Sequence, residues 1–418
     1  NNAIKKSKKV HQSAVIGLNF YDDGNGLITT GGGGLVHLWD IDNLADSKHI
    51  TASKSGITAF DALVEKNRFV TSSRTRRIRV WDLEGNEIFE FRDKLEDRSN
   101  SEPIRALEIS PDGSTVATSG FAKARSFKVK KGDNVIRIWD LNRGSLYKIL
   151  EGSVNPIYTF DFHPVENELV TLGQDRVLTF WDFNMAEKYG EFTLREPKRE
   201  IPPKMKFWSK ENLGKKKDRF LGNISNGRIG SIGRPNRGDL GNKTNKIGKG
   251  MIKRSFKEKP IVKFSSKGSY LITKLPKDEI RYYRMEDKKP EYVGPLWSYQ
   301  TNINNMLCSP DEKYLAVIGS GDTAVSVINM ETGEFERKLV TPGPKGRLNV
   351  LFEGNSLAFS NDGKYLAVCF NTSQTYVFET TNWNPVFQNI LPNQVGIPHG
   401  AFVNFSTDDE YMVVSSSF

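Results

Sequence analysis

The chain has 418 residues, of which 37% are hydrophobic, 11% aromatic and 26% charged. This length fits two or three ordinary domains or one large repetitive domain. No apolar run approaches the roughly 20 residues of a membrane-spanning helix, so we expect no membrane insertion. Two cysteines, Cys308 and Cys369, are too few for a disulfide framework or a cysteine-based zinc site, and the five histidines show no metal-ligand spacing.

The formal net charge of +10 is unevenly distributed. Residues 195–259 contain 20 Lys and Arg against 6 Asp and Glu, whereas the rest of the chain carries a small negative net charge. Such a basic segment can contact RNA phosphates or an acidic protein surface. It can equally be a solvated insertion that binds nothing specific. Within it, the Gly- and Lys-rich residues 234–256 predict a flexible loop.

A Trp-Asp pair recurs along the first half of the chain. The pairs are Trp39-Asp40, Trp81-Asp82, Trp139-Asp140 and Trp181-Asp182, separated by 42, 58 and 42 residues. Each pair ends a short β-rich run in which apolar and polar residues mostly alternate, as in a strand with one buried face. The spacing therefore predicts a repeated unit of β-strands.

Polar turns introduce a second set of predicted strands. The turn Ser110-Pro111-Asp112-Gly113 precedes a β-rich run at 115–118. Pro, Asp and Gly in such a tetrad reverse the chain between two antiparallel strands. Similar turns followed by similar runs occur at 163–172, 309–317, 360–368 and 406–414. The repeat therefore extends through both halves of the chain.

These units resemble the WD40 repeat family, whose repeats form the four-stranded blades of a β-propeller. The resemblance covers nearly all of residues 1–418 and implies an all-β fold with seven or eight blades, which can run into a second propeller. Later in the chain the Trp-Asp pair is replaced by Tyr283-Arg284, Ile328-Asn329 and Phe378-Glu379. Residues 205–232 are a candidate for one further degenerate blade, and residues 2–10 for an outer strand that closes the ring. Because the family's Gly-His signature is nearly absent, the resemblance implies that apolar packing holds the blades together.

No group of residues predicts catalysis, a metal ion or a cofactor. The run Gly31–Gly34 lacks the Gly-Lys-Ser/Thr of a phosphate loop and fits a tight turn. The run Asp22–Gly26 lacks the glutamate of an EF-hand calcium loop and also fits a turn. Cys308 and Cys369 lie in apolar runs typical of buried structural thiols. We therefore predict a protein that is not an enzyme.

Basic residues gather in the loops between the second and third strands of two neighbouring units. In the resembled family these loops share one face with the links between blades. Together with the basic segment, they would form a surface for an anionic partner. The candidate residues are Arg74, Arg76, Arg77, Lys123, Arg125, Lys128, Lys130, Lys131, Lys215, Lys216, Lys217 and Arg219. The alternative is that these charges only keep the protein soluble.

The leading functional prediction is a non-catalytic scaffold that holds other proteins of a multi-subunit, cytoplasmic assembly. A second is an RNA-contacting subunit of a ribonucleoprotein or ribosome-assembly complex, located in the nucleus or nucleolus. A third is a cytoskeletal protein, because the units at 117–140 and 162–181 resemble the WD repeats of echinoderm-microtubule-associated-protein-like proteins. A fourth is the ligand-sensing propeller of a larger signalling ATPase, which the residues neither favour nor oppose.

Overall fold

The computed structural model divides into two units, residues 197–257 and the remainder of the chain. The residues it describes all belong to the larger unit. They are 11–42, 45–63, 66–92, 101–122, 135–151, 157–173, 175–185, 187–194, 260–275, 279–286, 288–292, 297–298, 303–319, 324–341, 354–370, 374–389 and 401–416. Residues 205–232 and 2–10, the candidates for a further blade and a closing strand, lie outside these ranges.

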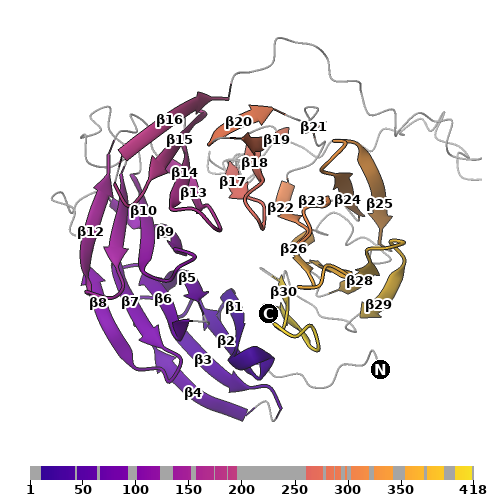
Figure 1. Ribbon diagram of the computed structural model, residues 1–418. Helices are drawn as coiled ribbons and strands as arrows, with labels where there is room; N and C mark the ends of the chain where they lie inside the picture. Colours follow the sequence, from indigo (N-terminus) through magenta and orange to yellow (C-terminus); the bar gives the residue numbers. More distant parts are fainter. Residues whose placement is uncertain are drawn as a thin grey trace, which may run out of the picture. The chain divides into compact units, whose positions relative to one another are not determined.

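Four antiparallel sheets, here called blades 1 to 4, occupy the first half of the chain (Figure 1). Blade 1 contains β1 (Val15–Tyr21), β2 (Gly26–Gly31), β3 (Leu35–Asp40) and β4 (Ala45–Thr51), with the 3-10 helix η1 (Asp22–Gly24) between β1 and β2. Blade 2 contains β5 (Ile57–Leu63), β6 (Arg68–Ser73), β7 (Arg77–Asp82) and β8 (Glu87–Arg92). Blade 3 contains β9 (Ser101–Ile109), β10 (Thr115–Ala122), β11 (Ile136–Asp140) and β12 (Ser145–Leu150). Blade 4 contains β13 (Ile157–Phe162), β14 (Glu168–Gly173), β15 (Val177–Asp182) and β16 (Glu187–Thr193).

Blades 5 to 8 follow in the second half of the chain. Blade 5 contains β17 (Ile261–Phe264), β18 (Tyr270–Leu275), β19 (Glu279–Glu286) and β20 (Lys289–Tyr292), with the short β21 (Trp297–Ser298) paired to β19. Blade 6 contains β22 (Ile303–Cys308), β23 (Tyr314–Gly319), β24 (Ala324–Asn329) and β25 (Phe335–Val340). Blade 7 contains β26 (Gly354–Phe359), β27 (Tyr365–Phe370), β28 (Thr375–Glu379) and β29 (Pro385–Asn389). Blade 8 has two described strands, β30 (Ala401–Phe405) and β31 (Met412–Ser416).

The blades follow one another around a ring, with the first strand of each blade innermost (Figure 1). Inner strands of consecutive blades contact each other from β1 to β17 and from β22 to β30, and β30 of blade 8 contacts β1 of blade 1. Blades 5 and 6 share a core that includes Tyr282 and Met306. Phe20, Leu27 and Trp39 of blade 1 share a core with Tyr411 and Val413 of blade 8. The all-β propeller expected from the repeat is therefore confirmed. The described residues form six four-stranded blades, blade 5 with its additional strand β21, and one two-stranded sheet that meets the first blade.

Blades 4 and 5 pack directly on each other, although residues 195–259 separate them in sequence. Val170 and Phe180 of blade 4 share a core with Val262 and Leu271 of blade 5. In the part of the ring that the structure describes, no sheet lies between these two blades.

Each tryptophan of a Trp-Asp pair packs against the preceding blade. Trp81 lies in the core of blade 1, Trp139 in that of blade 2 and Trp181 in that of blade 3. Tyr283, Ile328 and Phe378 take the same position against blades 4, 5 and 6. Burying a large side chain is worth about 1.5–3 kcal/mol, so each of these residues contributes strongly to its interface. The replacements identified from the sequence therefore keep the packing role.

We expected apolar packing alone to hold the blades together, but hydrogen bonds of the tryptophans contribute as well. Each of the four indoles donates its Nε1 hydrogen to a buried threonine on the neighbouring second strand. The pairs are Trp39 with Thr29 at 3.0 Å, Trp81 with Thr71 at 3.0 Å, Trp139 with Thr118 at 2.9 Å and Trp181 with Thr171 at 3.2 Å. In blade 1 His11 Nε2 also lies 3.0 Å from Thr29 Oγ1. A buried indole N–H without an acceptor would cost about 1–3 kcal/mol, so each threonine stabilises the tryptophan of its own blade.

In blades 2 to 4 the aspartate of the Trp-Asp pair accepts hydrogen bonds from the turn to the fourth strand. Asp140 Oδ1 accepts the backbone N–H groups of Asn142 and Arg143 at 2.8 Å. Asn329, which stands in place of an aspartate, accepts from Glu331 and Thr332 at 3.0 and 3.2 Å. A short polar side chain that accepts two turn N–H groups does not need a negative charge, so asparagine performs the same role.

Both glycine-containing motifs of blade 1 form turns, as predicted. Gly34 between β2 and β3 has a φ of +103°, and a Cβ atom there would lie 1.8 Å from the Ser53 carbonyl oxygen. Asp22–Gly24 forms the 3-10 helix between β1 and β2. Only glycine fits the position of Gly34 without displacing the backbone of the next connection.

Candidate interaction surface

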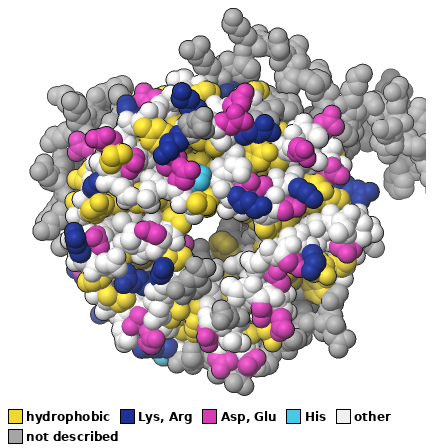
Figure 2. All heavy atoms as spheres, in the orientation of Figure 1, with side chains coloured by type: hydrophobic (Ala, Val, Ile, Leu, Met, Phe, Trp, Pro, Cys, Tyr) yellow, Lys and Arg dark blue, Asp and Glu magenta, His cyan; other side chains and the backbone are white. Residues whose placement is uncertain are grey.

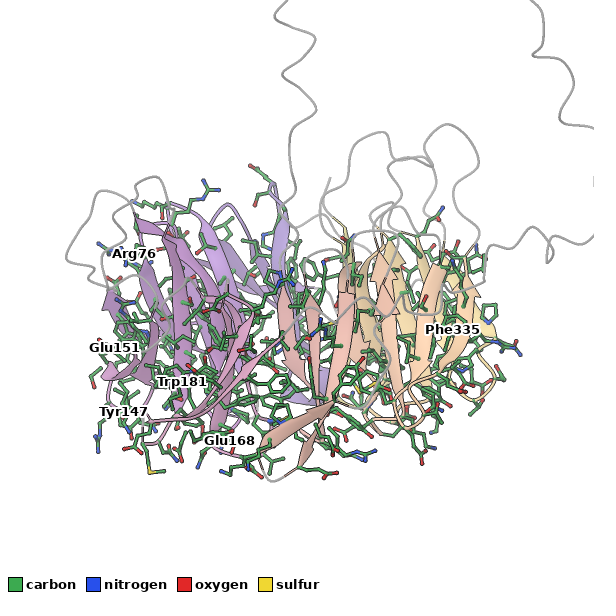
Figure 3. The ribbon with its side chains drawn as sticks, turned by 90° about the horizontal axis from the view of Figure 1, so that it is seen from above. Arg76, Tyr147, Glu151, Glu168, Trp181 and Phe335 are labelled. Carbon is green, nitrogen blue, oxygen red and sulfur yellow. The ribbon has the colours of Figure 1, made fainter. Side chains whose placement is uncertain are left out.

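The turns between second and third strands lie on one face of the ring. Figure 3 shows Arg76 of the β6–β7 turn towards this face and Glu168, at the start of β14, towards the opposite face. The links between blades reach the same face as Arg76. Ser13 Oγ, before β1, accepts the N–H of Gly33 at 2.7 Å, and the N–H of Arg74 donates to the Gly56 carbonyl at 3.2 Å. We call the side that carries these turns the turn face.

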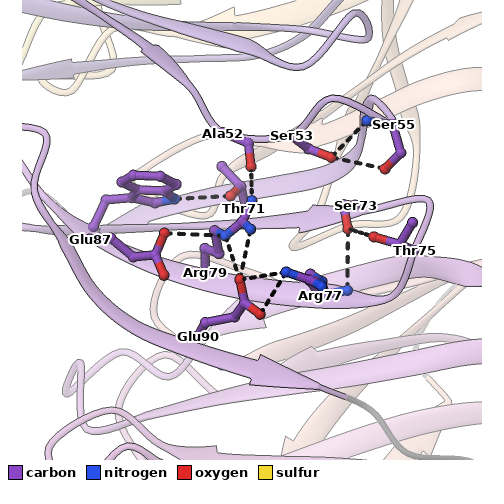
Figure 4. Close-up of polar contacts among 11 residues, drawn as sticks. Ala52, Ser53, Ser55, Thr71, Ser73, Thr75, Arg77, Arg79, Glu87 and Glu90 are labelled. Atoms are coloured by element: carbon purple, nitrogen blue, oxygen red, sulfur yellow. Dashed lines mark hydrogen bonds and ion pairs between the residues drawn. The ribbon is translucent and has the colours of Figure 1, made fainter.

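Short side-chain hydrogen bonds fix the turns of blade 2 and of the link before it (Figure 4). Ser53 Oγ lies 2.9 Å from Ser55 Oγ and accepts the Ser55 N–H at 3.1 Å. Ser73 Oγ lies 2.9 Å from Thr75 Oγ1 and accepts the Arg77 N–H at 3.2 Å. Turns that are already ordered lose little conformational entropy when a partner binds.

The predicted basic surface is described only at its blade 2 residues. Arg74 is exposed, whereas Arg76 and Arg77 are half-buried. Arg77 Nη1 forms an ion pair with Glu90 Oε1 at 3.0 Å, so part of its charge is compensated within the blade. The other nine residues of the predicted surface lie outside the described ranges. The surface therefore stays a prediction, with Arg74 as its most accessible described residue.

Arg79, two residues after Arg77 in β7, adds further ion pairs beside the same turns (Figure 4). Its Nη2 lies 2.7 Å from Glu90 Oε2, its Nε lies 3.2 Å from Glu87 Oε2, and it donates to the Ala52 carbonyl of the preceding link. Desolvation opposes ionisation of Glu90, but the hydrogen bonds and charges of Arg79 and Arg77 outweigh it and lower the pKa of Glu90. These ion pairs support the turn face and were not apparent from the sequence.

The inner strands carry a second polar group that sequence reasoning missed. Equivalent positions of the inner strands, opposite the second strand of each blade, hold Asp61 of β5, Glu108 of β9, Asp161 of β13 and Lys263 of β17. Asp61 Oδ2 accepts the Ile109 N–H of the next blade at 2.7 Å, and Asp161 Oδ2 accepts the Phe264 N–H at 2.7 Å. This shared position was the signal from which the group could have been found.

Lys263 joins three blades through this group. It forms an ion pair with Asp161 and lies 3.6 Å from Glu108 Oε1. Burial, helped by the charge of Asp161, raises the pKa of Glu108 well above its usual value, and burial also raises the pKa of Asp61. Burial would lower the pKa of Lys263, but Asp161 and Glu108 raise it. One ammonium group thus faces more than one carboxyl group, which favours the protonated form of Glu108.

A cavity of about 330 Å³ lies beside this group. Its lining residues are Ile16, Thr58, Ala59, Phe60, Ala106, Leu107, Glu108, Thr159, Phe160 and Lys263. Figure 2 shows an opening at the centre of the ring. The lining mixes two phenyl rings with one carboxyl and one ammonium group that already face each other. Because Glu108 and Lys263 contact each other across blades, they connect the blades.

The described residues contain no metal-ligand group and no helix that could cross a membrane. No three His, Cys, Asp or Glu side chains within the described ranges are arranged to hold a metal ion. No helix in that part of the chain is long and apolar enough for a membrane span. Cys369 is buried and Cys308 half-buried, and burial raises their pKa values to about 11 and about 12. Neither thiol is therefore a ready nucleophile at neutral pH.

The described sheets and turns define a β-propeller. The family model of the WD domain, G-beta repeat, matches residues 4–40 and 92–140. Two segments of the chain thus match the WD repeat, and the described sheets form the β-propeller that the four Trp-Asp pairs indicated.

Relatives with this repeat share modest identity with the chain. Cilia- and flagella-associated protein 52 of Chlamydomonas reinhardtii is 21% identical over 188 residues, 44% of this chain and 27% of that protein. Probable U3 small nucleolar RNA-associated protein 18 of Schizosaccharomyces pombe is 24% identical over 282 residues, 63% of this chain and 46% of that protein. WD repeat and SOCS box-containing protein 1 of Xenopus tropicalis is 28% identical over 109 residues, 26% of this chain and 22% of that protein. The chain thus spans less than half the length of each of these relatives.

Proposed function

We propose that the protein is a non-catalytic scaffold whose propeller holds other proteins of a multi-subunit, intracellular assembly. The observation that carries the proposal is the ordered turn face, where Ser53, Ser73 and their neighbours fix the turns before any partner is present. A rigid ring with ordered turns binds with a small entropic cost and can hold several partners at fixed separations. The relatives named above are described by different assemblies or associations, which fits a module whose partner varies.

Affinity purification of the full chain, followed by identification of what it retains, tests this proposal. Arg74→Glu reverses an exposed charge on the turn face, whereas Lys313→Glu reverses one on the β22–β23 turn of the opposite face. We expect the first variant to lose partners that the second retains, because the two turns lie on opposite faces. Retention of the same proteins by both variants would contradict a partner site on the turn face around Arg74.

The second candidate function is an RNA-contacting subunit of a ribonucleoprotein or ribosome-assembly complex, with a nuclear or nucleolar location. Two observations favour it: the basic charge of residues 195–259, and similarity over 63% of this chain to a relative named as a small nucleolar RNA-associated protein. Contacts between lysines and phosphates weaken steeply as salt rises, because they release counterions.

Retention on immobilised RNA at increasing salt separates this candidate from the scaffold proposal. We expect the intact chain to bind with strong salt dependence and a chain lacking residues 234–256 to bind more weakly. Binding that depends neither on salt nor on this segment would exclude the RNA role, and it would leave the scaffold proposal unaffected.

A third candidate is association with the cytoskeleton. It is supported by the resemblance of the units at 117–140 and 162–181 to the WD repeats of echinoderm-microtubule-associated-protein-like proteins, and by the similarity to a relative named for cilia and flagella. Co-sedimentation with polymerised tubulin tests it directly. We expect the full chain in the pellet if this candidate is correct, and in the supernatant at all tubulin concentrations if it is not.

A further inference from the structure

Three chain segments contact one another on the turn face of blades 1 and 2. They are the β2–β3 turn (32–34), the link between the blades (52–56) and the β6–β7 turn (74–76). The Ser53 N–H donates to the Gly34 carbonyl at 3.1 Å, and the Arg74 N–H donates to the Gly56 carbonyl at 3.2 Å. The link therefore joins the two turns, and Figure 4 shows it beside the β6–β7 turn. We call the three segments the glycine platform.

Glycine is required where these segments meet. A Cβ atom at Gly56, whose φ is +91°, would lie 2.5 Å from the Gly32 carbonyl oxygen. Gly32 is half-buried and Gly33 is exposed, so this part of the surface presents backbone without side chains. Because glycine has no Cβ atom, the backbone of another protein can approach such a surface closely. The platform therefore suits an extended segment that lies across it.

The N–H groups of the glycine turn are already donated within the protein. The pairs are Gly32 with the Ala14 carbonyl at 2.9 Å, Gly33 with Ser13 Oγ at 2.7 Å and Gly34 with the Gly31 carbonyl at 2.9 Å. A phosphate cradle needs backbone N–H groups that point at the ligand. This turn therefore does not form such a cradle, and recognition of an anion falls to the side chains beside it.

Two cations of the platform have no partner among the described residues. Lys54 and Arg74 are exposed, and neither side chain forms a hydrogen bond or an ion pair within the described ranges. Arg74 Nε would lie 3.4 Å from a Cβ atom at Gly56, so its side chain lies over the link. The three segments contain no Asp or Glu, whereas the neighbouring Arg77 is already paired with Glu90. The platform therefore carries positive charge that nothing nearby in the described chain compensates.

We propose that the glycine platform binds an extended acidic segment of a partner protein, whose carboxylates pair with Arg74 and Lys54. The inference rests on the proposed scaffold function and names the class of partner that the turn face holds. A guanidinium group matches the two oxygens of a carboxylate.

The same surface is poorly suited to RNA. None of the exposed aromatic side chains of the described residues lies in the platform, so a nucleobase has no ring there to stack on. The N–H groups that would hold a phosphate are occupied as well. Both observations favour an acidic peptide over a nucleic acid.

Fluorescence anisotropy of a labelled peptide with the full chain tests the proposal. The probe is a short synthetic peptide that alternates Glu and Gly, and its control has Gln in place of every Glu. We expect the acidic peptide to bind more weakly as salt rises, because salt screens exposed charges, and the Gln peptide to bind at least about tenfold more weakly. Equal binding of the two peptides would overturn the proposal.

Charge reversal locates the site. Arg74→Glu and Lys54→Glu should each weaken binding of the acidic peptide at least about fivefold, because a repulsion replaces an ion pair. Lys313→Glu, on the opposite face, is the matched control and should bind like the wild type. Wild-type affinity in the Arg74→Glu protein would overturn the site. Circular dichroism melting verifies that each variant remains folded.

A substitution without any change of charge tests the role of the exposed backbone. A Cβ atom at Gly32 would make only ordinary contacts, at 3.5 Å from Ile16 Cδ1 and 3.6 Å from the Ala14 carbonyl oxygen. Gly32→Leu should therefore fold, and it should weaken peptide binding several-fold because the new side chain keeps the peptide away from the backbone. Unchanged affinity would overturn the placement of the peptide across the glycine turn.

The affinity purification described above distinguishes failure of this inference from failure of the scaffold function. Loss of partners by Arg74→Glu, without any binding of the acidic peptide, would overturn the acidic class and leave the scaffold function intact. Retention of the same partners by Arg74→Glu and Lys313→Glu would contradict the partner site itself. Binding of polyuridine instead of the peptide, with the same dependence on Arg74, would overturn the peptide in favour of RNA.

Discussion

In blades 2 to 4 and in blades 5 to 7, a large side chain at the end of the third strand packs against the preceding blade, but the residue types differ. In blades 2 to 4 an indole fills the preceding blade and donates to a threonine, whereas Tyr283, Ile328 and Phe378 fill it in blades 5 to 7. What this position requires is thus a large apolar side chain that fills the space beside the preceding blade. The indole hydrogen bond adds to this packing. This difference explains why the Trp-Asp signature can disappear along the chain while the fold continues.

The largest expected effect comes from removing the packed side chain itself. Trp181→Ala and Phe378→Ala should each lower the free energy of unfolding by about 3–5 kcal/mol, because both leave a cavity between two blades. Urea unfolding measures both losses. A small loss for Phe378→Ala beside a large loss for Trp181→Ala would show that the two halves do not share one packing position.

An intermediate effect is expected at the charged group of the inner strands. Asp161→Ala should cost about 2–3 kcal/mol, because it removes the acceptor of the Phe264 N–H and leaves Lys263 with Glu108 alone. Asp161→Asn retains an acceptor oxygen and should cost less. Chemical denaturation of both variants gives the comparison, and equal losses would mean that charge alone matters at this position.

A smaller effect isolates the indole hydrogen bond. Thr171 and Thr273 occupy equivalent buried positions in blades 4 and 5, and each donates to a third-strand carbonyl at 3.4 Å. Only Thr171 also accepts from an indole. Thr171→Val should therefore cost about 1 kcal/mol more than Thr273→Val. Thermal unfolding of the pair measures the difference, and equal shifts in melting temperature would assign no stability to the indole bond.

The smallest effect is a pH dependence at Glu108. Because burial raises its pKa in the folded chain, the folded state holds this proton more tightly than the unfolded state. The stability that the protonated group contributes is present below its usual pKa and is lost as pH rises through the folded value. Because glutamine does not ionise, the Glu108→Gln variant does not lose this stability. Its free energy of unfolding should therefore rise relative to that of the wild type as pH increases above about 4.5. Unfolding curves for both proteins at several pH values test the sign.

The sequence predicted the strands, the repeat and the packing tryptophans, because these follow from local alternation and from a recurring motif. It missed the indole partners Thr29, Thr71, Thr118 and Thr171. Threonine is common in strands, and only the pairing register shows which of them lie beside an indole. It also missed that Asp61, Glu108, Asp161 and Lys263 meet, because four inner strands far apart in sequence bring them together. Pairing across blades depends on ring closure, which no local pattern encodes.

The most direct test of the account is whether the last described strands close the ring onto the first blade. Val413→Asp would place a charge in the core that blade 8 shares with Phe20 and Trp39, whereas Val340→Asp at an exposed position of β25 is the control. We expect the first variant to increase hydrogen exchange of the β1 and β2 amides, at the other end of the described chain, and the second to leave it unchanged. Unaltered exchange in blade 1 of the Val413→Asp protein would contradict a closed propeller.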